Sequence, residues 1–133
     1  MTENELGLIV LSVTLFVSTL LIALAAIISG ELGSRSINHP NHFVGIRLAS
    51  TMKSQATWVA AHKASLRPAY FAAVSLVPVG AILLIFVRQN PLAVTVLEGV
   101  LFLACCVWEA VAIVAAVKAA RAVEAASHKA GTR

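Results

Sequence analysis

Most of the side chains that could do chemistry lie in one polar stretch, residues 30–68, of an otherwise apolar chain. The residues of this stretch that we single out are Asn41, Gly45, Arg47, Trp58 and His62. Arg47 can hold a carboxylate or a lipid phosphate with two parallel hydrogen bonds. In a helix, His62 would share one face with Trp58 because four residues separate them. These residues either fasten a loop under the helices or form a site for a ligand or partner.

Two carboxyl groups in the third apolar run are the second chemical feature. Glu98 and Glu109 are eleven residues apart, so in a helix they lie on nearly one face, about 16 Å from each other. That distance excludes a shared-proton pair and a two-carboxylate hydrolase. Glu98 is close enough to the outer end of the run to reach water. Glu109 lies roughly 7 Å from the middle of the run.

Ionisable groups as deep as Glu109 usually face a partner or a wet cavity. We therefore expect Glu109 to pair with Arg47 or His62, and the alternative is a protonated carboxyl that the helix tolerates. Glu109 thus joins the five loop residues as a candidate motif or partner site.

Other common chemistries have no residues to carry them. The chain contains no Asp, no Gly-rich phosphate loop and no nucleophile with a nearby base. His39 and His42 are separated by Pro40, with no carboxylate or Cys nearby, which argues against zinc. The adjacent Cys105 and Cys106 point about 100° apart on a helix, so we interpret them as packing residues. We expect no enzyme, no cofactor and no metal site.

The elements that must position these residues are membrane-spanning helices. The chain has 133 residues, of which 59% are hydrophobic and 12% charged, and its mean hydropathy is +0.90. A bilayer core of about 30 Å takes ~20 helical residues. Three apolar runs reach that length, and we expect an all-α integral membrane three-helix bundle in a single domain, 1–133. The expected spans are about 6–28, 70–87 and 92–117.

Between the first two spans we expect a loop and then a basic, amphipathic helix over about 51–66. Ser50 or Thr51 could cap this helix, and Pro68 could end it or begin the next span. Such a helix usually lies in the headgroup plane, with Trp58 at the interface. The residues Gln89-Asn90-Pro91 predict a tight turn, so the second and third spans should form an antiparallel hairpin.

Small hydroxyl side chains occur within the first span: Ser12, Thr14, Ser18 and Thr19. Each either bonds to its own helix backbone or marks a face that packs closely against another helix. The first span follows an acidic leader, which favours a retained span over a cleaved signal peptide.

Basic residues fall on one side of the three predicted spans. Five of the Lys and Arg residues lie in 30–68 and four follow the third span, whereas the leader has none. Because short basic loops stay in the cytoplasm, we expect the N-terminus outside and the C-terminus inside. The formal net charge of +4 then reflects this bias and attraction to anionic lipid headgroups, and nucleic acid is not an expected partner.

The loop motif resembles the SdpI family, whose members typically read Gly-Ile-Arg-Thr-Pro-Trp-Thr-Leu, then five residues, then Trp-x-x-x-His. The positions that match are Gly45, Ile46, Arg47, Trp58 and His62, with Asn41, Thr51 and Ser54 beside them. The chain departs from the pattern at Leu48, Ala49 and Ser50, and at Gln55 and Ala56. The resemblance covers about Asn41 to the third span.

This resemblance implies a short, three-span member of a bacterial plasma-membrane family. The protein that names the family is longer, protects the producing cell from a sporulation-delaying peptide toxin, and holds a repressor at the membrane. An immunity or signalling module that recognises a peptide or lipid is therefore one hypothesis. A structural or accessory subunit of a larger membrane complex is the alternative. In either case we expect the partners to be the lipid bilayer and another membrane protein or a second copy of the chain.

Overall fold

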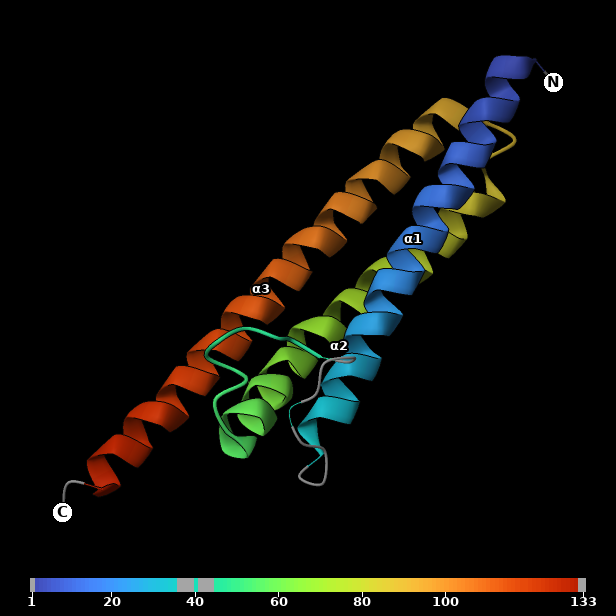
Figure 1. Cartoon of the computed structure of the whole chain (residues 1–133). Coiled ribbons are helices and arrows are strands. Elements are labelled where there is room, and N and C mark those ends of the chain that lie inside the picture. The colour runs from blue at the N-terminus through green and yellow to red at the C-terminus, as the bar shows by residue number, and fades with distance from the viewer. Residues whose placement is uncertain (1, 36–39, 41–44, 132–133) are drawn as a thin grey trace. The chain divides into compact units, whose positions relative to one another are not determined.

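The computed structural model consists of three long α-helices in chain order (Figure 1). These are α1 (Glu3–Ser34), α2 (Gln55–Ile85) and α3 (Pro91–Gly131). The structure describes residues 2–35, 40 and 45–131. Each helix is long and apolar enough to cross a membrane, as expected where backbone polar groups must be satisfied within the segment. The predicted all-α, three-span membrane protein is confirmed.

The first and third helices begin at side-chain caps. At the start of α1, the Glu5 N–H donates to Thr2 Oγ1 at 3.2 Å, and the Thr2 N–H donates to Glu5 Oε2 at 2.7 Å. This reciprocal pair satisfies two amides that have no partner inside the helix. At the start of α3, Asn90 Oδ1 accepts a hydrogen bond from the Ala93 N–H at 3.2 Å.

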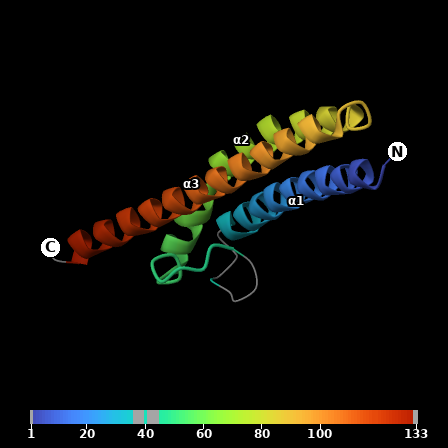
Figure 2. The same cartoon turned by 90° about the horizontal axis from the view of Figure 1, so that it is seen from above.

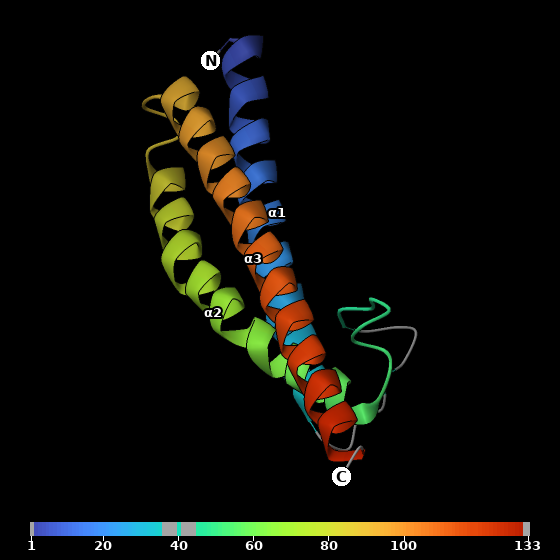
Figure 3. The same ribbon diagram turned by 90° about the vertical axis from the view of Figure 1, so that its left-hand side faces the viewer.

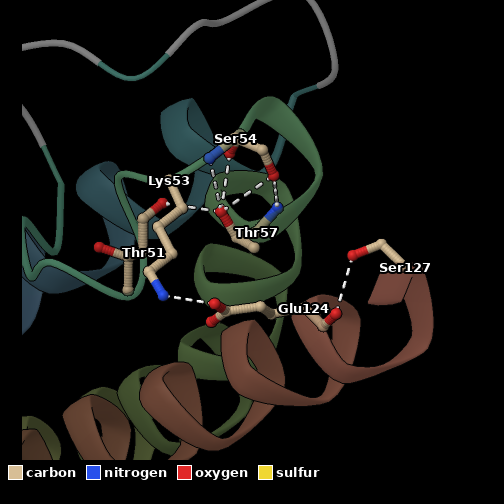
Figure 4. A network of polar contacts seen from close by, with 6 residues as sticks. All are labelled: Thr51, Lys53, Ser54, Thr57, Glu124 and Ser127. Carbon is tan, nitrogen blue, oxygen red and sulfur yellow. Dashed lines mark hydrogen bonds and ion pairs between the residues drawn. The ribbon is translucent and has the colours of Figure 1, made fainter. Parts of the chain in front are cut away.

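The second helix begins later than the sequence suggested. Ser54 caps it: the Thr57 N–H donates to Ser54 Oγ at 3.1 Å, and the Ser54 N–H donates to Thr57 Oγ1 at 3.0 Å (Figure 4). The predicted cap at Ser50 or Thr51 is therefore wrong. Thr51 is unavailable as a cap because its hydroxyl closes a turn in the preceding segment.

The helix then continues through Pro68 to Ile85. The segment predicted as a separate helix over about 51–66 is thus largely the first part of α2. Proline lacks an N–H and its ring crowds the carbonyl four residues earlier, here that of Ala64. Membrane helices tolerate this because neighbouring groups and hydroxyl side chains satisfy the freed backbone. The placement of this part of α2 in the headgroup plane stays a prediction.

The chain divides into two compact units. Unit 1 contains Met1–Leu24 and Tyr70–Trp108, and unit 2 contains Ala25–Ala69 and Glu109–Arg133. Within unit 1, α2 and α3 run antiparallel on either side of a tight turn (Figure 2), which confirms the predicted hairpin. The rings of Phe71 and Trp108 lie 4.7 Å apart across this hairpin.

Within unit 2, the segment that precedes α2 lies beside the last part of α3 (Figures 1 and 3). Here Ala61 of α2 packs against Ala116 and Ala120 of α3, and Ile46 covers this cluster. The segment 45–54 is called the loop segment below.

Small residues line the contacts inside each unit, whereas large apolar side chains face outward. Among the exposed ones are Leu21, Val74 and Leu103, which are 58%, 73% and 65% exposed. This distribution suits a lipid solvent, in which tight packing of small residues drives helix association. The buried residues of α1 are all small: Ser12, Thr19, Ala23, Gly30 and Gly33.

Candidate functional site

His62 is the centre of the predicted motif, and it is fully buried at 0% exposure. Its Nε2 accepts a hydrogen bond from the Ile46 N–H at 2.9 Å, and its Nδ1 lies 2.8 Å from the Trp58 carbonyl oxygen. An amide can only donate and a carbonyl can only accept. Both contacts are satisfied together only by the neutral imidazole with its proton on Nδ1. His62 therefore fastens the loop segment to α2.

Two glycines make room for the His62 ring. A Cβ at Gly33, in the last turn of α1, would lie 2.3 Å from ring atoms of His62. A Cβ at Gly45 would lie 2.3 Å from His62 Nε2 and 2.8 Å from the Trp58 ring. Gly45 also has a φ of 108°, in the region that residues with a Cβ rarely adopt. The sequence indicated a special role for Gly45 but not for Gly33.

Trp58 lies beside this ring and is also 0% exposed. The ring centroids of Trp58 and His62 are 4.2 Å apart, with the planes tilted by 42°. The Trp58 ring fills the space under Gly45 and does not face lipid or water, while its depth relative to the membrane interface stays a prediction. Within the described residues, its Nε1 has no hydrogen-bond partner, which is uncommon for a buried indole.

Thr51 gives the loop segment its internal shape. Its hydroxyl donates to the Ile46 carbonyl at 2.6 Å and accepts from the Leu48 N–H at 3.0 Å. The Thr51 N–H in turn donates to the Leu48 carbonyl at 2.9 Å. These bonds close a turn within 46–51 and bury the hydroxyl completely. The turn ends a few residues before α2 begins.

An ion pair ties the loop segment to α3. Lys53 Nζ donates to the Glu124 carboxylate, while Ser127 Oγ donates to the Glu124 carbonyl at 2.8 Å (Figure 4). The hydrogen bond from Lys53 lowers the pKa of the Glu124 carboxyl below its usual value. Both side chains are partly exposed, so solvent weakens the pair and it contributes little to stability.

The structure brings together three of the six predicted site residues: Gly45, Trp58 and His62. Arg47 lies on the exposed side of the loop segment, directly after the amide that binds His62. Asn41 lies outside the described residues.

Glu109 does not reach His62. Both ring nitrogens of His62 already have backbone partners. In unit 2, Ala61 packs level with Ala116, and Glu109 is seven residues from Ala116, about 10 Å along the helix. The buried Glu109 Oε1 has no hydrogen-bond partner among the residues that the structure describes. Pairing of Glu109 with Arg47 stays a prediction.

Glu98, which the sequence placed near water, is the most deeply enclosed carboxyl. It is 0% exposed, and neither carboxylate oxygen has a hydrogen-bond partner in the described part of the chain. A Cβ at Gly80 of α2 would lie 3.1 Å from Glu98 Oε2. The prediction that Glu98 reaches water was wrong because it considered only how far Glu98 lies from the end of α3. The other helices of unit 1 cover this face.

One turn before Glu98, a hydroxyl pair joins α1 to α3. Ser12 Oγ lies 2.8 Å from Thr95 Oγ1, and both residues are buried. Thr14, in contrast, donates to the Val10 carbonyl of its own helix. The two alternatives for the hydroxyls of the first span therefore apply to different residues. Thr19 donates to the Leu15 carbonyl of its own helix, yet it is also buried in unit 1.

Comparison with known protein families confirms the resemblance to the SdpI family. A sequence model of the SdpI/YfhL protein family matches residues 38–117, which is more than half of the chain. This range contains the loop segment, α2 and the apolar part of α3 up to Val117. No curated protein and no solved structure matches the chain.

Proposed function

Because this chain belongs to the SdpI/YfhL protein family, we propose that it is an immunity or signalling module that recognises a peptide or lipid at the membrane. The observation that carries the proposal is the fixed conformation of the loop segment. His62 holds its start and Thr51 closes its turn, while Arg47 stays on the exposed side. A surface that is ordered before binding loses less entropy when a ligand docks.

Arg47 is the residue that would contact the ligand. Its planar guanidinium can bind a carboxylate or a phosphate through two parallel hydrogen bonds. The rings of Trp58 and His62 would position Arg47 indirectly, because they hold the backbone of residues 45 and 46. In this proposal the buried members of the motif position the segment and do not touch the ligand.

The proposed location is the bacterial plasma membrane, with the N-terminus outside and the C-terminus in the cytoplasm. The basic residues of the loop segment and of the end of α3 support this orientation. Single cysteines at Asn4 and Ala125, both exposed, would test it in a chain lacking Cys105 and Cys106. In intact cells, an impermeant thiol reagent should label the first position and not the second. The reverse pattern would overturn the orientation.

A second candidate function is that of an accessory subunit of a larger membrane complex. It is favoured by Glu109, an ionisable side chain within α3 that is only half-buried. The exposed part of this side chain could meet a polar group on a partner helix.

Expression in a toxin-sensitive host separates the two functions. A module with its own ligand should protect the host when expressed alone, and Arg47→Ala should abolish protection at an unchanged protein level. Lys63→Ala is the matched control, because it removes one exposed charge outside the loop segment. An accessory subunit should give no protection and should be recovered with a partner after gentle solubilisation.

A further inference from the structure

An open cavity of ≈ 380 Å³ lies in unit 2, between the loop segment and the last part of α3. Its volume is within the range of small-molecule sites, about 300–1,000 Å³. The residues that line it combine apolar, hydroxyl and charged side chains: Leu48, Ala49, Ser50, Lys53, Val117, Arg121 and Glu124.

The charged side of the cavity carries two cations and one anion. Lys53 is bound to Glu124, so this anion neutralises only one of the cations. The charge of Arg121 also helps to lower the pKa of the Glu124 carboxyl, but the ion pair of Glu124 is with Lys53. A guanidinium in this position matches the fork geometry of a phosphate. The cavity is therefore suited to an anion with several oxygen atoms.

The apolar side of the cavity lies where the third apolar run ends. Val117 is the last residue of that run, and Arg121 follows one turn later, about 6 Å further along the helix. Leu48 of the loop segment adds a second apolar side chain on this side. A change from apolar to basic over one helical turn corresponds to the boundary between acyl chains and headgroups.

We propose that this cavity binds the phosphodiester headgroup of an anionic phospholipid. Arg121 and Lys53 hold the phosphate, the Ser50 hydroxyl donates to one of its oxygens, and Leu48 and Val117 contact the beginning of the acyl chains. To reach the phosphate, Lys53 leaves Glu124 or shares its three donors between the two anions. The inference goes beyond the proposed function, because it places a lipid beside the loop segment in a cavity that Arg47 does not line.

Lipid binding to the purified full-length chain tests the proposal. Native mass spectrometry from detergent micelles would count bound phosphatidylglycerol and, separately, phosphatidylcholine. We expect phosphatidylglycerol to bind preferentially. Arg121→Gln and Lys53→Gln should each weaken its binding about fivefold, from the contribution of one basic side chain near an anionic lipid. Circular dichroism would confirm that each variant remains helical.

Two matched variants separate a site from general charge attraction. Lys118→Gln removes a positive charge from an exposed side chain of the same helix that does not line the cavity, and should change binding less than about twofold. Glu124→Gln should tighten binding, because it releases Lys53 from its partner. Equal weakening by Lys118→Gln and Arg121→Gln would overturn the proposal.

Inorganic phosphate distinguishes a lipid from a soluble ligand. Displacement of phosphatidylglycerol by millimolar phosphate would mean that the cavity binds free phosphate. This result would contradict the assignment of a lipid as the ligand. The protection assay is a separate measurement. If the chain protects the host but shows no preference for phosphatidylglycerol, the lipid site is wrong and the proposed function is unaffected. If it prefers phosphatidylglycerol but does not protect the host, the proposed function is wrong and the lipid site is unaffected.

Discussion

Gly45 and His62 meet so closely that a Cβ on the glycine would lie 2.3 Å from the ring nitrogen Nε2. The same ring nitrogen accepts the amide of Ile46, the next residue. The contact and the hydrogen bond therefore depend on each other, because a ring pushed away from Gly45 also leaves the Ile46 amide unpaired.

Gly45→Ala should destabilise the chain. The added methyl group meets two rigid rings, and the φ of 108° is strained for alanine, so we expect a loss of about 1–3 kcal/mol. Thermal unfolding in detergent would measure it. Gly99→Ala is the control, because nothing lies within 4 Å of its Cβ position. In this helix position alanine should be neutral or stabilising. An equal loss for both variants would contradict the prediction.

His62→Phe should weaken the attachment of the loop segment while preserving most of the ring volume. Phenylalanine cannot accept the Ile46 N–H, and a buried amide without a partner costs about 1–3 kcal/mol. Hydrogen exchange at Ile46 should become faster in the variant, whereas amides in the middle of α3 should keep their protection. Unchanged exchange at Ile46 would show that the hydrogen bond does not hold the segment.

Glu98→Gln should leave stability within about 1 kcal/mol of the parent chain. Neither carboxylate oxygen has a partner among the described residues, so the amide loses no interaction and keeps the side-chain volume. Glu98→Ala should cost more, about 2 kcal/mol, because it leaves a cavity beside Gly80. Unfolding in mixed micelles would compare the two variants. A loss for Gln as large as that for Ala would mean that the carboxylate has a partner in the membrane.

Ser12 and Thr95 should be coupled. Ser12→Ala, Thr95→Val and the double variant form a cycle, and hydrogen bonds between membrane helices average about 0.6 kcal/mol in such cycles. Thr14→Ala should have almost no effect, since its hydroxyl bonds to the exposed side of its own helix. A zero coupling energy between Ser12 and Thr95 would show that their contact contributes nothing to the association of α1 and α3.

Composition was sufficient to predict the helices but not the contacts between them. The three spans and the tight turn before α3 follow from run length and from Asn90 and Pro91, which act locally. The start of α2 does not follow from local sequence. Ser50, Thr51 and Ser54 are all residue types that cap helices well. Which of them caps α2 depends on which hydroxyl already forms hydrogen bonds within the loop segment.

The structure places Gly45, Trp58 and His62 of the predicted site together, and the role of the site stays a prediction. The spacing of Trp58 and His62 indicated a shared helix face, and both are indeed packed together. The depth of Glu98 and the distance of Glu109 from His62 depend on how far one helix slides along another. That register comes from small residues such as Gly80 and Ala116, which carry little signal in a single sequence.

The five buried positions of α1 hold nothing larger than threonine, and this has a consequence for how the chain can change over generations. At its outward-facing apolar positions, Leu, Ile, Val and Phe can replace one another, since lipid accommodates each of these side chains. An enlargement at any of the five small positions instead pushes a neighbouring helix away. The outward-facing positions of this helix should therefore change quickly, whereas the five small positions should stay nearly fixed. A library of random α1 variants would show directly which positions tolerate substitution.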